Sequence, residues 1–431
     1  MLAVKIIAFF AALIFSVVAG EKLKINAGLF AIPLAFIIGC TLGGQSVSTI
    51  INLFPVRVFY NLTIATIFYG FANENGTMKA LTRKLVYLFR NAQWSMPLVL
   101  FIISLILSAS GANLEATVIM LSPLAFSLAA EMGFNPFLAA LTLWAGGCAG
   151  NWVPWGSMTN AFAALFFDVL GEEAAYAAFN KMFVTLLIIL LVIVGVMFVV
   201  YKGYKANGHV DMDDVVMTPE NRKTLCVLFV SLAIIVIPAL LQLIVPNPVT
   251  KWLTSYLNIQ TVAAISSAIM ALMKLADTGS VIKNRVPWNM IIMICGVTML
   301  MGLVNCLGIT DSLSQFLASG SIPMILVVPL LTAIFALLSF FVSGMVLQPL
   351  LVSFAPALLA LGISGGTIVT AAQAGGIVSS LSPYSAAGAM AISGCSENDR
   401  LAVSGKMIRY AIIFSVIVSL LAFTGVYAIG G

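Results

Sequence analysis

Residues 108–160 read SASGANLEATVIMLSPLAFSLAAEMGFNPFLAALTLWAGGCAGNWVPWGSMTN. The stretch is apolar enough to enter a membrane, but Ser, Asn, Gly and Pro interrupt it at two places. In a bilayer, each unpaired backbone N–H or C=O group costs several kcal/mol, so breaks persist only where protein or a wet cavity satisfies them. The pattern therefore predicts a re-entrant hairpin over 97–126 and a discontinuous helix over 137–166.

The composition of the whole chain agrees with this interpretation. Of its 431 residues, 61% are hydrophobic and 8% are charged, whereas about a quarter of the residues in soluble domains are charged. The excess of 20 Lys and Arg over 15 Asp and Glu is too small for a nucleic-acid-binding surface. The six cysteines are scattered without metal-ligand spacing. We expect an all-α polytopic membrane protein that is not an enzyme and binds no nucleic acid or cofactor.

Other apolar runs have the length of a membrane-spanning helix. Predicted full spans lie near 4–19, 28–46, 58–73, 181–201, 224–245, 259–275, 289–307 and 408–429. Residues 77–92 place leucines at helical spacing between basic residues, which predicts a helix lying in the membrane interface. Residues 202–223 are polar and predict a linker.

Glycine, proline and serine positions recur roughly 230 residues further along the chain, which is the signature of an internal repeat. The pairs are Pro55 with Pro287, Gly70 with Gly302, Ser110 with Ser343, Pro123 with Pro356, and Gly146 with Gly375. A second hairpin is thereby predicted over 322–357 and a second broken helix over 367–394. Each repeat then has five transmembrane helices, and this odd number inverts the second repeat relative to the first.

The basic residues test this topology, because Lys and Arg collect on the cytoplasmic side. The map places on one side Lys22, Lys24, Lys79, Arg83, Lys84, Arg90, Lys202, Lys205, Arg222, Lys223, Lys274, Lys283, Arg285, Arg400, Lys406 and Arg409. The other side has Lys5, Arg57, Lys181 and Lys251. We therefore predict a multi-pass protein of the cell (inner) membrane, with both termini outside and the 202–223 linker in the cytoplasm.

The broken segments carry polar residues and no Lys or Arg. Half-helix N-termini and hydroxyls can bind an anion, and oxygen ligands can hold a hard cation such as Na⁺. The predicted substrate-binding residues are Ser110, Asn113, Asn151, Trp155, Ser157, Thr159, Ser343, Ser380, Ser382 and Tyr384. The alternative is that these small and polar residues only let helices pack closely.

Glu115 follows the first hairpin tip, and the repeat pairs it with Gln348. An ionisable group at membrane depth is a functional candidate by default. Glu115 is a candidate proton-coupling site, with a cation ligand or a hydrogen-bonded structural acid as alternatives. Trp152 and Trp155 lie beside the first break and either wall the substrate cavity or pack between helices.

Segments 108–160, 286–313 and 343–391 resemble the ion transporter superfamily, in particular the divalent anion–sodium symporters and the malonate/dicarboxylate carriers. The resemblance implies a homodimer and an elevator-type transporter, in which a transport domain slides past a scaffold domain. The implied parts are scaffold 1–96, transport 97–201, linker 202–223, scaffold 224–320 and transport 321–431. The implied candidate Na⁺ ligands are Ser108, Ser110, Asn113, Gly147, Gly150, Ser343, Gly376 and Ser379.

The symporters carry Ser-Asn-Thr at each tip, whereas this chain has Ser-Gly-Ala-Asn from Ser110 and Ser-Gly-Met-Val from Ser343. This departure makes H⁺ coupling through Glu115 an alternative to Na⁺ coupling. The expected function is transport of a di- or tricarboxylate-like organic anion. The alternatives are an inorganic or arsenical oxyanion transporter of the same superfamily, and the membrane subunit of an uptake system that needs an extracytoplasmic binding protein.

Overall fold

The computed structural model describes residues 2–23, 25–88, 93–110, 114–207, 216–244, 247–309, 312, 322–340 and 344–429, and these residues form helices and connecting turns. The first half of the chain contains α1 (Leu2–Leu23), α2 (Ala27–Thr41), α3 (Val47–Asn52), α4 (Val56–Glu74), α5 (Thr77–Leu88), η1 (Gln93–Ser95), α6 (Met96–Ala109), α7 (Leu114–Met132), α8 (Pro136–Asn151), α9 (Ser157–Leu165), α10 (Phe167–Leu170), α11 (Glu172–Val200) and η2 (Gly203–Lys205).

The second half follows in a similar order. It contains α12 (Pro219–Ile244), α13 (Pro248–Tyr256), α14 (Ile259–Leu272), α15 (Thr278–Ser280), η3 (Val281–Arg285), α16 (Trp288–Cys306), α18 (Met324–Ser339), α19 (Gly344–Ala360), α20 (Gly365–Ser379), α21 (Ala386–Ala391), α22 (Glu397–Leu421), η4 (Ala422–Thr424) and η5 (Val426–Ala428). Helices separated by the predicted repeat distance correspond in the pairs α2/α14, α4/α16, α6/α18, α7/α19, α8/α20, α9/α21 and α11/α22.

Helix ends differ from the predicted spans where capping residues extend a helix beyond its apolar run. The helix α22 begins at Glu397, well before the predicted start of that span at 408, because the Ser396 side chain accepts the Asp399 N–H. The helix α12 begins at Pro219, inside the predicted linker, and Pro suits the first helical position. The amphipathic α13 is not predicted by the sequence pattern; Asn247 caps it in a capping box with Thr250.

Spans recognised by length and hydropathy are fewer than the ten that the repeat predicts. Within the described residues, four single helices qualify, in α1, α11, α12 and α22. Two bent pairs also qualify, α13 with α14 at 52° and the α15–η3 segment with α16 at 53°. The shorter apolar helices include α2, α6 and α18, together with the stretches Thr117–Met132 of α7 and Leu347–Ala360 of α19.

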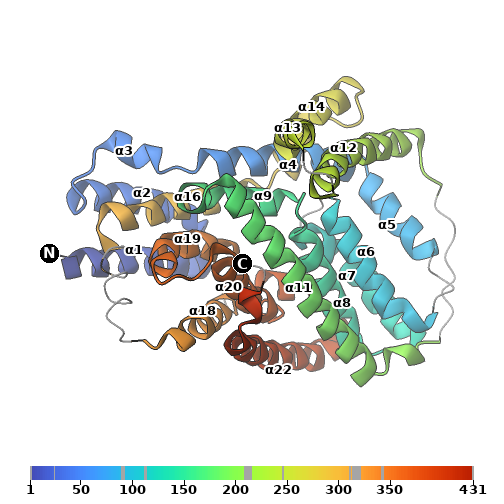
Figure 1. Ribbon diagram of the computed structural model, residues 1–431. Coiled ribbons are helices and arrows are strands. Elements are labelled where there is room, and N and C mark those ends of the chain that lie inside the picture. The colour runs from blue at the N-terminus through green and yellow to red at the C-terminus, as the bar shows by residue number, and fades with distance from the viewer. Residues whose placement is uncertain are drawn as a thin grey trace.

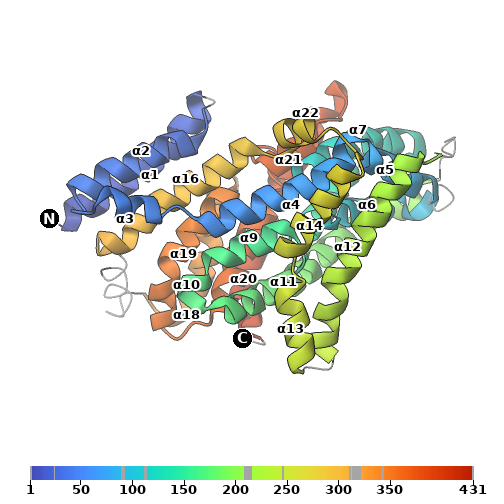
Figure 2. The same cartoon turned by 90° about the horizontal axis from the view of Figure 1, so that it is seen from above.

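Packing brings the two halves of the chain together. The helix α2 packs on α16, and its counterpart α14 packs on α4, the counterpart of α16. Within each half the first arm of the predicted hairpin packs on the broken helix, as α6 on α8 and α18 on α20. Figure 1 shows α3, α4, α13 and α14 along one edge, with α18 and α22 at the opposite edge. Figure 2, seen from above, shows α2 and α16 running side by side.

An ion pair joins the two halves at the end of α4. The Arg285 Nε donates to Glu74 Oε2 at 2.5 Å, and the Ser280 hydroxyl donates to the other carboxylate oxygen. Gly70 leaves room for this contact, because a Cβ there would lie 3.0 Å from the Cβ of Arg285. The Arg285 side chain is 42% exposed and that of Glu74 is 21% exposed, so solvent screens their attraction.

We expect Glu74→Gln and Arg285→Gln each to lower stability by about 1 kcal/mol, because a half-exposed ion pair contributes little. Thermal unfolding in detergent at low salt measures both single variants and the double variant. The double variant should lose no more stability than the less stable single variant. High salt should reduce the stability difference between each variant and the unaltered protein. Additive losses in the double variant would contradict a direct interaction.

Candidate functional site

The first broken helix consists of α8 and α9. Asn135 caps α8, with its side chain accepting the Phe137 N–H, and Pro136 occupies the first turn. The helix ends at Asn151 because the next residues include Pro154, which lacks an N–H and clashes with the preceding turn. Backbone helix resumes at Ser157. The break therefore lies at 152–156, within the predicted broken helix.

The second broken helix consists of α20 and α21. Ser364 caps α20 by accepting the Thr367 N–H, and the helix ends at Ser379, shortly before Pro383. The Ser385 hydroxyl then accepts the Gly388 N–H at 3.2 Å and starts α21. This break lies at 380–385, again where the sequence pattern predicts it.

The predicted hairpins 97–126 and 322–357 correspond to the helix pairs α6–α7 and α18–α19. Their tips, at 111–113 and 341–343, lie outside the described residues. The predicted site residues Asn113 and Ser343 are among them, so the structure does not place these two.

Glycines let the hairpin arms touch the broken helices. A Cβ on Gly146 would lie 2.2 Å from the Phe101 carbonyl oxygen, and one on Gly375 would lie 2.0 Å from the Thr332 carbonyl oxygen. Real Cβ atoms do not approach so closely, so only glycine permits this contact between backbones. Part of the glycine signal in the sequence thus reflects helix packing.

The candidate Na⁺ ligands Gly147 and Gly150 lie in the last turns of α8, and Gly376 lies inside α20, so all three have helical backbone. The Gly147 carbonyl accepts the Ser108 hydroxyl at 2.9 Å, and the Gly376 carbonyl accepts the Ser379 hydroxyl at 3.1 Å. These hydrogen bonds fasten α6 to α8 and hold the end of α20.

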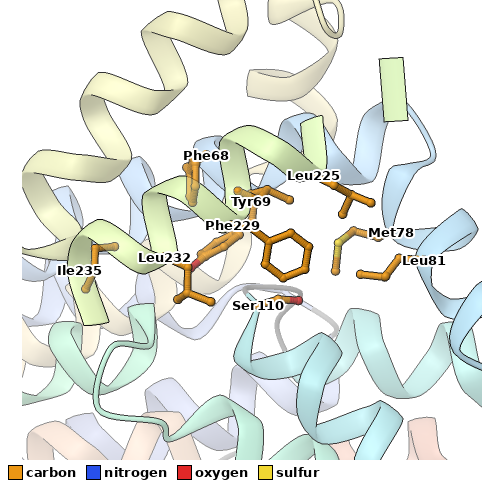
Figure 3. Close-up of a pocket in the computed structure, with 10 residues that line it drawn as sticks. Phe68, Tyr69, Met78, Leu81, Ser110, Leu225, Phe229, Leu232 and Ile235 are labelled. Carbon is orange, nitrogen blue, oxygen red and sulfur yellow. The ribbon is translucent and has the colours of Figure 1, made fainter. Parts of the chain in front are cut away.

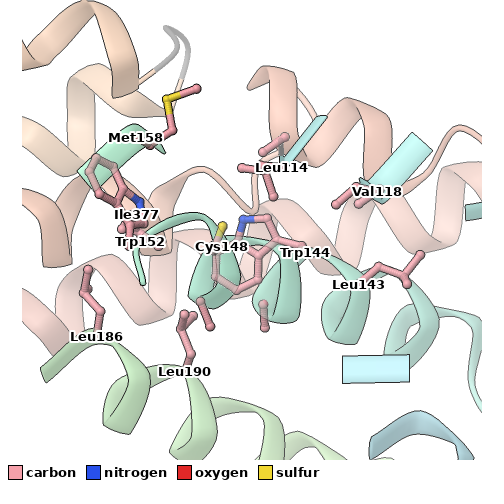
Figure 4. Packing of buried hydrophobic residues seen from close by; sticks show 14 of the residues in the cluster. Leu114, Val118, Leu143, Trp144, Cys148, Trp152, Met158, Leu186, Leu190 and Ile377 are labelled. Carbon is pink, nitrogen blue, oxygen red and sulfur yellow. The ribbon is translucent and has the colours of Figure 1, made fainter. Parts of the chain in front are cut away.

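A hydrogen bond connects α8 to the second break. The Trp144 Nε1 donates to the Ser380 hydroxyl at 3.0 Å, although 236 residues separate them. Trp144 is fully buried, and the buried Cys148 lies on the same face of α8, one turn later. Figure 4 shows the surrounding cluster, which includes Trp144, Cys148, Trp152, Ile377, Leu186 and Leu190. The structure therefore brings α8 together with the predicted residue Ser380, and sequence reasoning did not identify Trp144 as its partner.

Hydroxyl groups at the described breaks and tips direct their protons to backbone carbonyls. Ser110 donates to the Leu107 oxygen at 3.0 Å, and Ser380 donates to the Ile377 oxygen at 2.7 Å. Neither hydroxyl has a proton left for an anion. The Ser110 oxygen keeps its lone pairs, whereas the Ser380 oxygen accepts the Trp144 N–H and keeps one lone pair. These oxygens are suited to a cation, whose ligands must be electron-pair donors.

Two hydrogen-bond donors at the first break do not donate to a backbone carbonyl. The Trp155 Nε1 and the Thr159 Oγ1 are buried and have no hydrogen-bond partner within the described part of the chain. An indole N–H is only a donor, and a buried donor without a partner loses about 1–3 kcal/mol. Both groups are therefore suited to an acceptor oxygen that the described residues do not supply.

The other predicted residues of the first break lie at the helix ends that flank it. Asn151 is buried at the end of α8, and Ser157 begins α9. Nearby, the Asn160 Nδ2 donates to the Gly156 oxygen at 2.8 Å, and the Asn61 Nδ2 of α4 donates to the Asn160 oxygen at 3.3 Å. These bonds tie the break to α4.

At the second break, Ser382 is buried and its hydroxyl accepts the Tyr384 N–H at 3.2 Å. Tyr384 is 63% exposed. The Phe340 ring at the end of α18 lies beside it, with ring centroids 6.3 Å apart. The structure thus places Ser380 and Ser382 inside the break and Tyr384 at its surface.

Further buried polar atoms lie on the helices beside the second break. Ser339 Oγ, Gln348 Oε1, Thr370 Oγ1 and Gln373 Nε2 are buried without a partner in the described part of the chain. Sequence reasoning missed Ser339, Thr370 and Gln373. The signal for Gln373 was present, because it is an amide in the middle of an apolar run.

Glu115 occupies the first turn of α7, directly after the first tip. The helix dipole favours the ionised form of an acidic side chain there, which is compatible with a coupling site, a cation ligand or a structural acid. Ser110, on the other side of the tip, faces an apolar pocket of about 20 Å³. Figure 3 shows this pocket between Tyr69 of α4, Met78 of α5 and Phe229 of α12. It has room for about one water molecule, so Ser110 is closely packed against these neighbours.

We expect Gly375→Ala to destabilise the protein, because its methyl group would overlap the Thr332 carbonyl. Overpacking of this kind costs about 1–3 kcal/mol. Gly405→Ala on α22 is the matched control, since a Cβ there meets nothing within 4 Å and Ala favours helix by about 1 kcal/mol. Thermal unfolding in detergent should show a lower Tm for Gly375→Ala and an unchanged or higher Tm for Gly405→Ala. Equal Tm values would show that the contact is not tight.

Known proteins share this architecture. The family model described as the dicarboxylate carrier protein MatC N-terminus matches residues 2–151. A solved structure of the YdaH transporter of Alcanivorax borkumensis is similar with a TM-score of 0.63 and 16% sequence identity, covering 94% of this chain and 97% of that one. At this identity the likeness shows the fold alone. No curated protein sequence matches the chain.

A second family model, described as the sodium:sulfate symporter transmembrane region, matches residues 147–428, which is well over half of the chain. The match includes α9, α11 and the entire second half, with its broken helix α20–α21. The chain therefore belongs to the family of the sodium:sulfate symporter transmembrane region, and it is a multi-pass membrane protein of a transporter family and not an enzyme.

Proposed function

We propose that the chain is a secondary active transporter that moves a di- or tricarboxylate-like organic anion across the cytoplasmic membrane, coupled to Na⁺ or H⁺. The family descriptions name a dicarboxylate carrier and a sodium:sulfate symporter. The observation that carries the proposal is the pair of unpartnered buried donors at the first break, Trp155 Nε1 and Thr159 Oγ1. They offer hydrogen bonds to an anion in segments that contain no Lys or Arg.

The same hydrogen-bond pattern supports separate roles for the two ligands. The anion takes its hydrogen bonds at the first break, from Trp155 and Thr159. The coupling cation takes oxygen ligands whose protons are already directed elsewhere, such as Ser108, Ser379 and Ser380. A bound cation then supplies the positive charge that the segments lack. Asn113 and Ser343 are further proposed ligands, and Glu115 is the proton site if H⁺ is the coupling ion.

The topology belongs to the same proposal. Two inverted repeats place the termini outside and the 202–223 linker in the cytoplasm, and the corresponding helices of the two halves support this arrangement. Residues 1–96 and 224–320 form the scaffold, and 97–201 and 321–431 form the transport part. By the family resemblance, the scaffold also holds two copies together as a homodimer.

Contacts between the parts differ in the two halves, which supports an elevator mechanism. In the first half, the scaffold helix α4 packs on α9. In the second half, the counterpart of α4 is α16, which packs on α19. The counterpart of α9 is α21, which packs on α7 and α8. In the proposed topology, α9 and the α18–α19 hairpin are the outward halves of the transport part. When the scaffold contacts these outward halves of the transport part, the transport part lies toward the cytoplasm. In the outward-facing state, the contact patterns of the first and second halves of the chain are exchanged.

Proteoliposomes test the proposed activity. We expect labelled di- or tricarboxylates to accumulate under an inward Na⁺ or H⁺ gradient, and not without one, because the ion gradient drives accumulation. Under an H⁺ gradient, Glu115→Gln should abolish the dependence on pH. Uptake of oxyanions alone, or uptake only with an added binding protein, would contradict the proposal in favour of the alternatives.

The donors are tested one by one. Trp155→Phe and Thr159→Val each remove a hydrogen bond to a charged ligand, worth about 1.5–3 kcal/mol, so the substrate KM should rise roughly ten- to a hundred-fold. The matched controls are Trp94→Phe, at a side chain that is 60% exposed, and Thr298→Val, whose hydroxyl bonds within α16. Unchanged KM values in folded Trp155→Phe and Thr159→Val proteins would remove both residues from the site.

Cross-linking tests the two states in a background without native cysteines. Asn61→Cys with Asn160→Cys should cross-link, because their helices are in contact and their side chain and backbone are hydrogen-bonded. Repeat equivalence assigns the outward-facing pair to Met293→Cys with Ala389→Cys on α16 and α21. Each cross-link should stop uptake, and each should form less readily when the other is made first. Simultaneous formation of both cross-links would rule out the exchange of contacts.

A further inference from the structure

A long groove runs between α18 and α22, on the side of the molecule away from the scaffold helices α2 and α4 (Figure 1). Its volume is about 560 Å³. One wall includes Leu330, Ala333 and Leu337 of α18, and the other includes Ser415, Val416 and Ser419 of α22. Small side chains in both walls face the hollow between larger apolar ones.

The lining offers no hydrogen bond to a polar ligand. Its only side-chain hydroxyls belong to Ser415 and Ser419, which donate to the Ala411 and Ser415 carbonyls of their own helix at 2.7 and 2.8 Å. None of the described residues that line the groove is charged. Its occupant is therefore a hydrocarbon rather than a substrate anion or a coupling ion.

The position of the groove identifies the source of the hydrocarbon. The helix α22 lies in a segment, 397–424, that is long and apolar enough to cross a membrane. On the groove walls, Leu337 is 67% exposed and Val416 is 53% exposed, as expected for a face in contact with lipid. The groove extends along α18 for roughly 20 Å at 1.5 Å per residue, which is comparable to one leaflet of a hydrocarbon core about 30 Å thick.

We propose that the groove between α18 and α22 binds one acyl chain of a membrane lipid. Helices and lipid tails associate in a membrane by packing rather than by hydrophobic exclusion, so a concave, close-fitting surface retains a chain longer than a flat one. The inner end of the groove is Phe340, whose ring lies beside Tyr384 of the second break. The bound chain thus contacts the end of α18 next to the candidate site.

Photolabelling tests this site. The full-length protein is reconstituted in phosphatidylethanolamine and phosphatidylglycerol vesicles that contain a phosphatidylcholine with a diazirine on one acyl chain, and labelled peptides are mapped by mass spectrometry. We expect several-fold more label on α18 and α22 than on the exposed face of α11. Ala333→Trp and Ser415→Trp fill the groove from opposite walls and should each remove this excess.

Val192→Trp is the control, because Val192 is 58% exposed on α11, outside the groove, and should leave the labelling of α18 and α22 unchanged. Two variants from opposite walls keep the test valid if one fails to fold. Label spread evenly over α11, α18 and α22 would overturn the proposal. A dimer of the chain that dissociates in both groove variants would also overturn it, because a second copy would then be the occupant.

Discussion

Close contact between the hairpin arms and the broken helices is the constraint on which the rest of the structure depends. The helices α8 and α20 stop at mid-chain breaks, and their freed backbone groups need partners that a lipid environment cannot supply. The arms α6 and α18 approach closely only because Gly146 and Gly375 have no side chain. Serine hydroxyls such as that of Ser108 then bond to the exposed carbonyls. The breaks are therefore stable because the arms cover them.

This construction also determines what the breaks can bind. Most serine protons near the breaks are donated to helix carbonyls, which leaves oxygen lone pairs but few free N–H or O–H groups. The Trp144 indole N–H donates its hydrogen bond to Ser380 and so joins the two broken helices. Within the part of the chain that the structure describes, Trp155 and Thr159 have no partner for their donors at the first break. A site of this kind separates acceptor oxygens from donors, as a transporter that binds a cation and an anion together requires.

The two halves of the chain have similar helices but different neighbours. The α4–α9 contact has the Asn61–Asn160 hydrogen bond, whereas Met293 and Ala389 stand at the equivalent positions of the second half. The elevator mechanism proposed above depends on this difference, because alternating access between inverted repeats exchanges such contacts between the two halves. Under that proposal, the hydrogen bond favours the arrangement in which α4 packs on α9.

The sequence by itself determined the membrane class, the repeat and the places where both helices break, because hydropathy, Pro154 and Pro383 act locally. It also indicated the serines of the second break. Only the tertiary structure decided which polar side chains at the breaks have no hydrogen-bond partner among the described residues, because a hydroxyl acts as a donor or an acceptor according to the group that packs against it. Gln373 and the Trp144–Ser380 bond escaped sequence reasoning for this reason: their partners, or the lack of them, depend on helices far apart in the chain.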